Sequence, residues 1–213
     1  MIMSRVTKVL LFTVTACPIG RNMDIVIKEV CTELPQLEFE VIYTDLQHEI
    51  TNRFCVSNNP TIIILDRMGK ELYRVKEFTE TDDMLAIIKQ TEAGKLTAEK
   101  CIDATTGSIE EYFVYLLKDN ELAPVRVTYY NKTSVKSPRI SAIKCLIIGE
   151  EGYVSPFPPS SELLSVRFDG SAGEVVVRVS PSDLQIDQET MREALLHTLG
   201  HFGILQVNLE LVH

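Results

Sequence analysis

The run from Val9 to Val14 constrains the fold most, because it is short and almost wholly apolar and lies just before residues that favour the start of a helix. Six residues are too few for a membrane-spanning helix, which needs about 20. They fit a strand that is buried on both faces. Cys17-Pro18 follows, and proline suits the first helical turn because its missing N–H would have had no partner there. We therefore expect a buried strand that leads through a cysteine into a helix.

The same segment allows a second interpretation. Arg5 and Lys8 precede the apolar run, and V-T-A-C at 14–17 has the form of a bacterial lipoprotein cleavage site. The apolar run is at or below the lower limit for a signal peptide. We therefore expect a strand in a cytoplasmic protein, and the alternative is an exported lipoprotein anchored at Cys17.

Strand and helix patterns alternate from the first residues to residue 92. The order is β-α-β-α-β-β-α, with a turn over Asp66–Gly69 where glycine provides a positive φ. After the first strand, the expected elements are a helix over 18–34, a strand over 37–43, a short helix capped by Asp45 and reaching Arg53, strands over 62–65 and 71–75, and a helix capped by Thr79.

Two motifs in this region resemble the thioredoxin fold over residues 6–90: a strand ending in Cys17 at a helix N-terminus, and N-P-T-I-I-I-L at 59–65 before a D-x-x-G-K turn. The resemblance implies an α/β thioredoxin-like domain over 1–92. It also implies a cis peptide before Pro60, which would face Cys17. The W-C-G-P-C of thioredoxins is A-C-P-I-G here, so Gly20 stands where the second cysteine would be.

Cys17 is the candidate nucleophile of this domain. A helix N-terminus has unpaired N–H groups and a partial positive charge, and both favour thiolate over thiol. Arg21 adds a nearby cation. Pro18, Ile19 and Asn59 are the candidate binding residues around the cysteine.

A resolving thiol would have to come from elsewhere, because release of a mixed disulfide needs a second thiol. Cys31 lies fourteen residues along the same helix, roughly 21 Å away at 1.5 Å per residue, and cannot reach Cys17. Cys55 lies in the approach to Pro60 at a distance that the sequence leaves open, and a small thiol is another candidate. Cys31 and Cys145 are expected as core residues. Five cysteines without a C-x-x-C pair fit a reducing compartment.

Residues 93–108 lose periodicity and are expected to be a linker before a second domain over 109–213. The pattern predicts an α+β domain of order β-β-α-β-β-α-β, with helices on one face of a single sheet. The expected elements are strands over 111–117 and 125–130, a helix over 138–148 ended by Gly149, strands over 163–168 and 174–179, a helix that Asp187 caps and that runs to about Phe202, and a strand over 204–212.

Four blocks of this domain are similar to the GerMN domain, a family named from bacterial spore-germination and sporulation proteins. They are A-I-K-C-L-I-I-G-E-E-G-Y-V-S-P-F-P at 142–158, L-L-S-V-R-F-D-G at 163–170, E-V-V-V-R-V-S at 174–180 and H-T-L-G-H-F-G-I-L-Q-V-N-L-E-L-V at 197–212. The resemblance implies assembly or envelope-associated interaction, without an established catalytic activity. Most members of that family are exported, in contrast to the cytoplasmic location expected above.

His197 and His201 form an i, i+4 pair on one predicted helix, as in the H-E-x-x-H zinc proteases. Thr198 stands where the catalytic glutamate would be, so no general base is positioned to activate a zinc-bound water. His213 would be a third ligand only if the last strand ran beside this helix. We expect no metal site and no cofactor.

The net charge of −9, from 21 basic and 30 acidic residues, lacks the basic excess that nucleic acid binding needs. No apolar run is long enough for a transmembrane segment. We therefore expect a bacterial protein with a non-catalytic or regulatory role in interaction or assembly, acting on a protein partner. The alternative is a monothiol oxidoreductase or redox sensor that uses Cys17 on a disulfide-bearing substrate.

Overall fold

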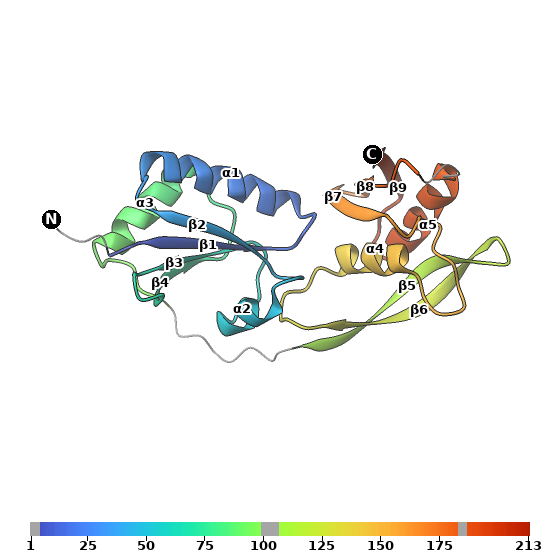
Figure 1. The fold of residues 1–213 in the computed structure, drawn as a ribbon, viewed down its shortest axis with the longest axis horizontal. Coiled ribbons are helices and arrows are strands. Elements are labelled where there is room, and N and C mark those ends of the chain that lie inside the picture. Colours follow the sequence, from blue (N-terminus) through green and yellow to red (C-terminus); the bar gives the residue numbers. More distant parts are fainter. Residues whose placement is uncertain (1–4, 99–106, 183–186) are drawn as a thin grey trace. The chain divides into compact units, whose positions relative to one another are not determined.

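The computed structural model describes residues 5–98, 107–182 and 187–213, and the chain in it forms two compact units (Figure 1). The first unit comprises the described residues up to 107 together with 132–136. The second comprises 108–131 and 137–213. The segment 132–136 thus belongs to the first unit, although it lies within the span expected for the second domain. None of the described helices is long and apolar enough to cross a bilayer.

The first unit is built on a four-stranded mixed sheet in the order β2-β1-β3-β4. Its elements are β1 (Lys8–Thr13), α1 (Pro18–Glu33), β2 (Glu38–Tyr43), α2 (His48–Arg53), β3 (Thr61–Leu65), β4 (Glu71–Val75) and α3 (Thr81–Glu92). β1 is parallel to β2 and antiparallel to β3, which is antiparallel to β4. The chain order is the one expected, and the first apolar run is a central strand of the sheet.

Helices α1 and α3 lie together on one face of this sheet (Figure 1). The core that they enclose consists of large apolar side chains with almost no exposed surface, including Val9, Leu11, Met23, Ile27, Val30, Ile62, Ile64, Met84 and Ile88. Leu10 and Phe12 point to the other face of β1 and are also buried. Each such side chain contributes roughly 1.5–3 kcal/mol on burial, so β1 stabilises the unit through both of its faces.

Two predicted helix caps in this unit are wrong. Helix α2 begins after Gln47 and not after Asp45, whose carboxylate accepts hydrogen bonds from the N–H (3.0 Å) and the hydroxyl (2.5 Å) of Thr15. Helix α3 begins after Glu80 and not after Thr79, whose hydroxyl donates to a carbonyl of its own loop. In both cases the capping side chain has another partner.

The second unit contains two sheets and two helices. Its elements are β5 (Ser108–Lys118), β6 (Glu121–Asn131), α4 (Pro138–Ile148), β7 (Glu162–Asp169), β8 (Ala172–Arg178), α5 (Gln188–Gly200) and β9 (Gln206–Val212). β5 and β6 form a long hairpin closed by Asp119 and Asn120, both at positive φ. β8 pairs with β7 antiparallel and with β9 parallel. The order of elements is as predicted, but the prediction of one sheet is wrong.

The outer edge of β5 is closed to a further strand. The N–H of Leu117 donates to the carbonyl of Val154 (2.8 Å), and the N–H of Val154 donates back to the carbonyl of Leu117 (2.9 Å). The N–H of Tyr115 donates to the hydroxyl of Thr198 on α5 (3.1 Å). A loop and a helix therefore occupy the positions that a further strand would need.

Two other local predictions are confirmed. The Asp66 carboxylate accepts hydrogen bonds from the N–H groups of Met68 and Lys70, and φ of Gly69 is +75°. The Asp187 carboxylate caps α5 by accepting from the N–H of Thr190 (3.1 Å). These bonds lie within four residues of the chain, so neighbours in sequence suffice to form them.

Candidate functional site

Cys17 occupies the N-cap position of α1 and is 7% exposed. Pro18 follows in the first turn of the helix. The turn before the helix is made by Ala16, which lies in the left-handed region at a φ of +66°, a conformation that few non-glycine residues adopt. The N–H of Cys17 donates to the carbonyl of Val14 (3.2 Å), which closes this turn. The cysteine is therefore held where β1 passes into α1.

Asn59 connects this turn to the segment that enters β3. Its side-chain Nδ2 donates to the sulfur of Cys17 (3.4 Å). Its Oδ1 accepts from the N–H of Val14 (3.2 Å) and from the hydroxyl of Thr13 (3.0 Å). The peptide bond between Asn59 and Pro60 is cis. One side chain thus contacts both the thiol and the end of the strand that leads to it.

A second thiol does not fit at position 20. A Cβ built on Gly20 would lie 1.8 Å from Oγ1 and 2.6 Å from Cβ of Thr13, much closer than real Cβ contacts. Thr13 therefore fills the space that a side chain at Gly20 would need. Thr13 is not among the residues predicted for the site, although a polar residue at the end of an otherwise apolar buried strand is a signal for one.

The remaining predicted site residues lie around the same helix start or at the entry to β3. Ile19 is 48% exposed, and Arg21 is exposed one turn into α1. The backbone N–H of Arg21 donates to the carbonyl of Cys17 (3.2 Å). Pro18 is half-buried and Pro60 is buried. Among these residues, Ile19 is thus the large apolar side chain that is exposed.

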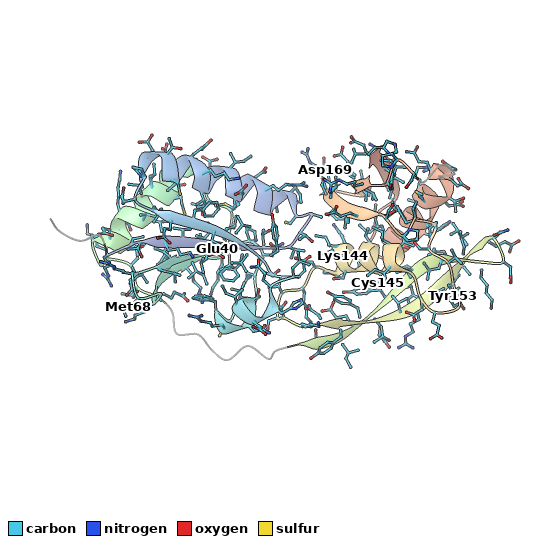
Figure 2. All side chains as sticks on the ribbon, in the orientation of Figure 1. Glu40, Met68, Lys144, Cys145, Tyr153 and Asp169 are labelled. Carbon is cyan, nitrogen blue, oxygen red and sulfur yellow. The ribbon has the colours of Figure 1, made fainter. Side chains whose placement is uncertain are left out.

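The other described cysteines are poor candidates for chemistry with Cys17. Cys55 is disulfide-bonded, which differs from the reduced state expected for a reducing compartment, and it is not a free thiol that could resolve an adduct. Cys31 and Cys145 are free and half-buried. Figure 2 labels Cys145 on α4. Burial raises the pKa of Cys31. Burial, followed by the charges of Glu150 and Glu110, raises the pKa of Cys145 to about 11, so it is protonated at neutral pH.

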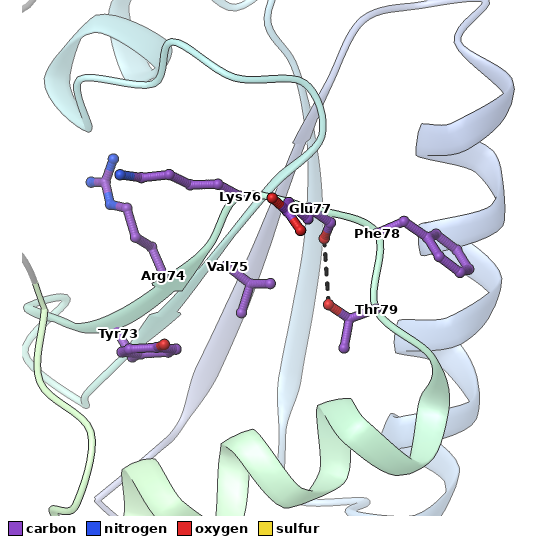
Figure 3. Close-up of a pocket in the computed structure, with 7 residues that line it drawn as sticks. All are labelled: Tyr73, Arg74, Val75, Lys76, Glu77, Phe78 and Thr79. Carbon is purple, nitrogen blue, oxygen red and sulfur yellow. Dashed lines mark hydrogen bonds between the residues drawn. The ribbon is translucent and has the colours of Figure 1, made fainter.

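Residues 73–79, in β4 and the loop before α3, line a shallow pocket of about 310 Å³ in the first unit (Figure 3). Figure 3 shows the ring of Phe78 turned toward α1. The N–H of Thr79 donates to the sulfur of Met23 on that helix (3.4 Å), which ties the loop to α1. None of the predicted site residues lines this pocket.

The histidine pair of the second unit lies against aromatic side chains of β5. The ring of His197 stacks on Tyr115 with 4.8 Å between centroids, and His201 lies 5.6 Å from Phe113 and 6.2 Å from Tyr115. Thr198, at the position of a protease glutamate, is fully buried. Within residues 5–98, 107–182 and 187–213, no group of three or more His, Cys, Asp or Glu side chains could hold a metal ion.

Comparison with solved structures finds thioredoxins. The chain is similar to thioredoxin-2, a component of the malaria parasite protein secretion machinery, at 22% identity over 42% of this chain and 86% of that chain, with a TM-score of 0.38. Chloroplastic thioredoxin z matches at 22% identity over 43% and 81%, with a TM-score of 0.38. The thioredoxin of Fasciola hepatica matches at 23% identity over 41% and 82%, with a TM-score of 0.37. No family model and no curated protein matches the chain.

Proposed function

We propose that the first unit is a thioredoxin-like interaction module that captures a partner by forming a mixed disulfide at Cys17. The observation that carries this proposal is the space at Gly20, which the side chain of Thr13 already occupies. A dithiol enzyme needs a thiol there to release its substrate. A site with one thiol and no room for a second is suited to holding a partner rather than to turning over disulfides.

The capture step is a thiol–disulfide exchange. The thiolate of Cys17 attacks one sulfur of a partner disulfide R–S–S–R′, a bond forms between Cys17 and the R sulfur, and R′–S⁻ leaves with the electron pair of the broken bond. No net oxidant or reductant is consumed. The adduct then lasts until an external thiol reaches it.

Asn59 supports this step through its hydrogen bond to the sulfur of Cys17. Its own orientation is set by the bonds that its Oδ1 accepts from Thr13 and Val14. A donor fixed in this way stabilises negative charge on the sulfur, because bonds to a charged acceptor are about twice as strong as those to a neutral one. The exposed side chain of Ile19 adds an apolar contact beside the thiol.

We propose the second unit as the part that selects the partner. The similarity of its sequence blocks to the GerMN domain favours a role in a bacterial protein assembly, such as one formed in sporulation or germination. The two units together then make a regulatory interaction protein in which Cys17 adds a covalent, reversible bond to a non-covalent contact.

The test is to incubate the protein with oxidised glutathione and to measure the adduct at Cys17 by peptide mass spectrometry, with Cys17→Ser as the control. Capture predicts an adduct that persists for hours without added thiol. Rapid release by reduced glutathione, with net reduction of a peptide disulfide over many turnovers, would instead make the protein a monothiol oxidoreductase. No adduct at Cys17 would contradict both thiol functions and leave a non-covalent interaction module.

A further inference from the structure

In the hairpin of β5 and β6, the outer edge of β5 is hydrogen-bonded to other parts of the unit, whereas part of the outer edge of β6 has no backbone partner among the described residues. The N–H groups of Tyr115 and Leu117 point away from β6, to Thr198 and Val154. The register of the hairpin has no irregularity along its length. In an antiparallel ladder, opposite residues face the same way, so every second residue of β6 points its N–H and C=O away from β5. These residues are Leu122, Pro124, Arg126, Thr128 and Tyr130.

The part of this edge from Arg126 to Tyr130 is without partners. Across the described ranges, no hydrogen bond joins the outward N–H groups of Arg126, Thr128 and Tyr130 to any acceptor. Pro124 is also a residue whose N–H would point away from β5, so the absence of this N–H removes no hydrogen bond from the hairpin. It also ends the usable edge, because it has no donor for a further strand.

We propose that β6 of one chain pairs with β6 of a second copy, antiparallel about a two-fold axis at Thr128. Thr128 then lies opposite Thr128 of the second copy, and Arg126 lies opposite Tyr130. Each of these pairs exchanges two backbone hydrogen bonds. The two hairpins become one continuous sheet of four strands. A two-fold interface of this kind must be self-complementary, since each contact occurs twice.

The side chains of the edge satisfy that condition. Arg126 and Tyr130 point to the exposed face of the hairpin: the Arg126 side chain is 62% exposed and Tyr130 is 59% exposed. The guanidinium of Arg126 donates to the carboxylate of Glu111 on β5, and its face stays open to a ring of the second copy. Opposed across the axis, the guanidinium and the ring form a cation–π pair twice. Threonine opposite threonine is a favourable cross-strand pair. Ile109 and Phe113, exposed on the same face, extend the apolar surface on β5.

Other registers are worse. If the register between the two copies moves by one pair toward Pro124, Pro124 lies opposite Tyr130 of the second copy. The pair then lacks one backbone hydrogen bond, because proline has no N–H. A shift by two pairs also places Arg126 opposite itself, and like charges directly opposite are destabilising. A shift the other way places Arg126 opposite residue 132, beyond the end of β6 at Asn131, and loses that pair. The register about Thr128 therefore keeps the most pairs, which is the reason to name a second copy as the occupant of this edge.

The test is the mass of the full chain in solution by sedimentation velocity over a range of concentrations. We expect a monomer–dimer equilibrium for the wild type. Thr128→Lys and Thr128→Glu each place like charges opposite one another at the axis and should raise the dimer dissociation constant by about tenfold or more. An equimolar mixture of the two variants should recover the dimer, because opposite charges then meet.

Asn208→Lys is the matched control, since Asn208 is exposed on β9 of the other sheet and the charge change is the same. It should dimerise as the wild type does. The side chain of Thr128 is exposed and its outward N–H is unused, and within its own hairpin it lies opposite Glu111. Far-UV circular dichroism should show both variants folded, and Thr128→Lys, which places an opposite charge beside Glu111, is the variant that decides. A wild type that stays monomeric, or a Thr128→Lys variant that dimerises unchanged, would overturn the proposal.

Discussion

The side-chain amide of Asn59 donates a hydrogen bond to the sulfur of Cys17, 42 positions earlier in the chain and 3.4 Å away. The bond joins the entry of β3 to the start of α1. The Oδ1 of the same side chain accepts from the end of β1, so the donor has little freedom to turn away from the sulfur. Asn59 therefore determines the surroundings of Cys17 through both ends of one amide.

Asn59→Asp should slow the reaction of Cys17 with a disulfide reagent by about tenfold, the equivalent of one hydrogen bond to a charged group. The aspartate keeps an oxygen for Val14 and Thr13 but replaces the donor by a negative charge beside the sulfur. The measurement is the rate of adduct formation at Cys17 by peptide mass spectrometry. An unchanged rate would show that the donor does not act on the thiol.

Asn59→Ala separates this effect from folding. It removes the donor and the acceptor together, so we expect a loss of about 1–3 kcal/mol in the free energy of unfolding as well as a slower reaction. Urea unfolding of both variants gives the comparison. If Asn59→Asp lowered the free energy of unfolding as much as Asn59→Ala does, the bonds accepted from Thr13 and Val14 would not be what stabilises the turn before α1.

Gly20→Ala should destabilise the protein by about 1–3 kcal/mol, although alanine normally improves a helix. The new Cβ would overlap the side chain of Thr13. Gly200→Ala in α5 is the matched control, because a Cβ there meets no atom within 4 Å, and it should be neutral or stabilising by up to about 1 kcal/mol. Thermal unfolding of the two variants is the measurement, and equal shifts would contradict the packing at position 20.

Cys145 should be alkylated in the folded protein only at high pH, since its pKa is raised to about 11, chiefly by burial. The folded state holds this proton more tightly than the unfolded state, whose thiol titrates near 9.0. The stabilisation is therefore complete below pH 9 and is lost as pH rises toward 11. Urea unfolding should show a steeper loss of stability over this range in the wild type than in Cys145→Ala. Rapid labelling of folded Cys145 at pH 7 would contradict this.

Thr198→Val should expose the Tyr115 amide to hydrogen exchange, because the hydroxyl that accepts its N–H is removed from a fully buried position. The unpaired N–H costs about 1–3 kcal/mol. Thr198→Ser keeps the acceptor and should keep the amide protected. Hydrogen exchange read by NMR at this amide distinguishes the two variants, and equal protection in both would show that the hydroxyl is not its partner.

The sequence predicted the order of elements in both units, because helical and strand periodicity follow directly from the spacing of apolar residues. It also predicted the turn at Asp66 and the cap at Asp187. In each of these the acceptor and the donor lie within four residues, so local geometry is enough to bring them together. The strand interpretation of the first apolar run likewise follows from its length and composition.

Only the tertiary structure decided which polar side chain contacts which distant group. The carboxylate of Asp45 accepts from Thr15 and does not cap α2, and the N–H of Tyr115 at the edge of β5 donates to the hydroxyl of Thr198 and not to a further strand. The space at Gly20 is closed by Thr13, on the preceding strand. Hydrogen bonds and steric contacts act over a few ångströms, and a sequence does not specify which distant residues folding brings within that range.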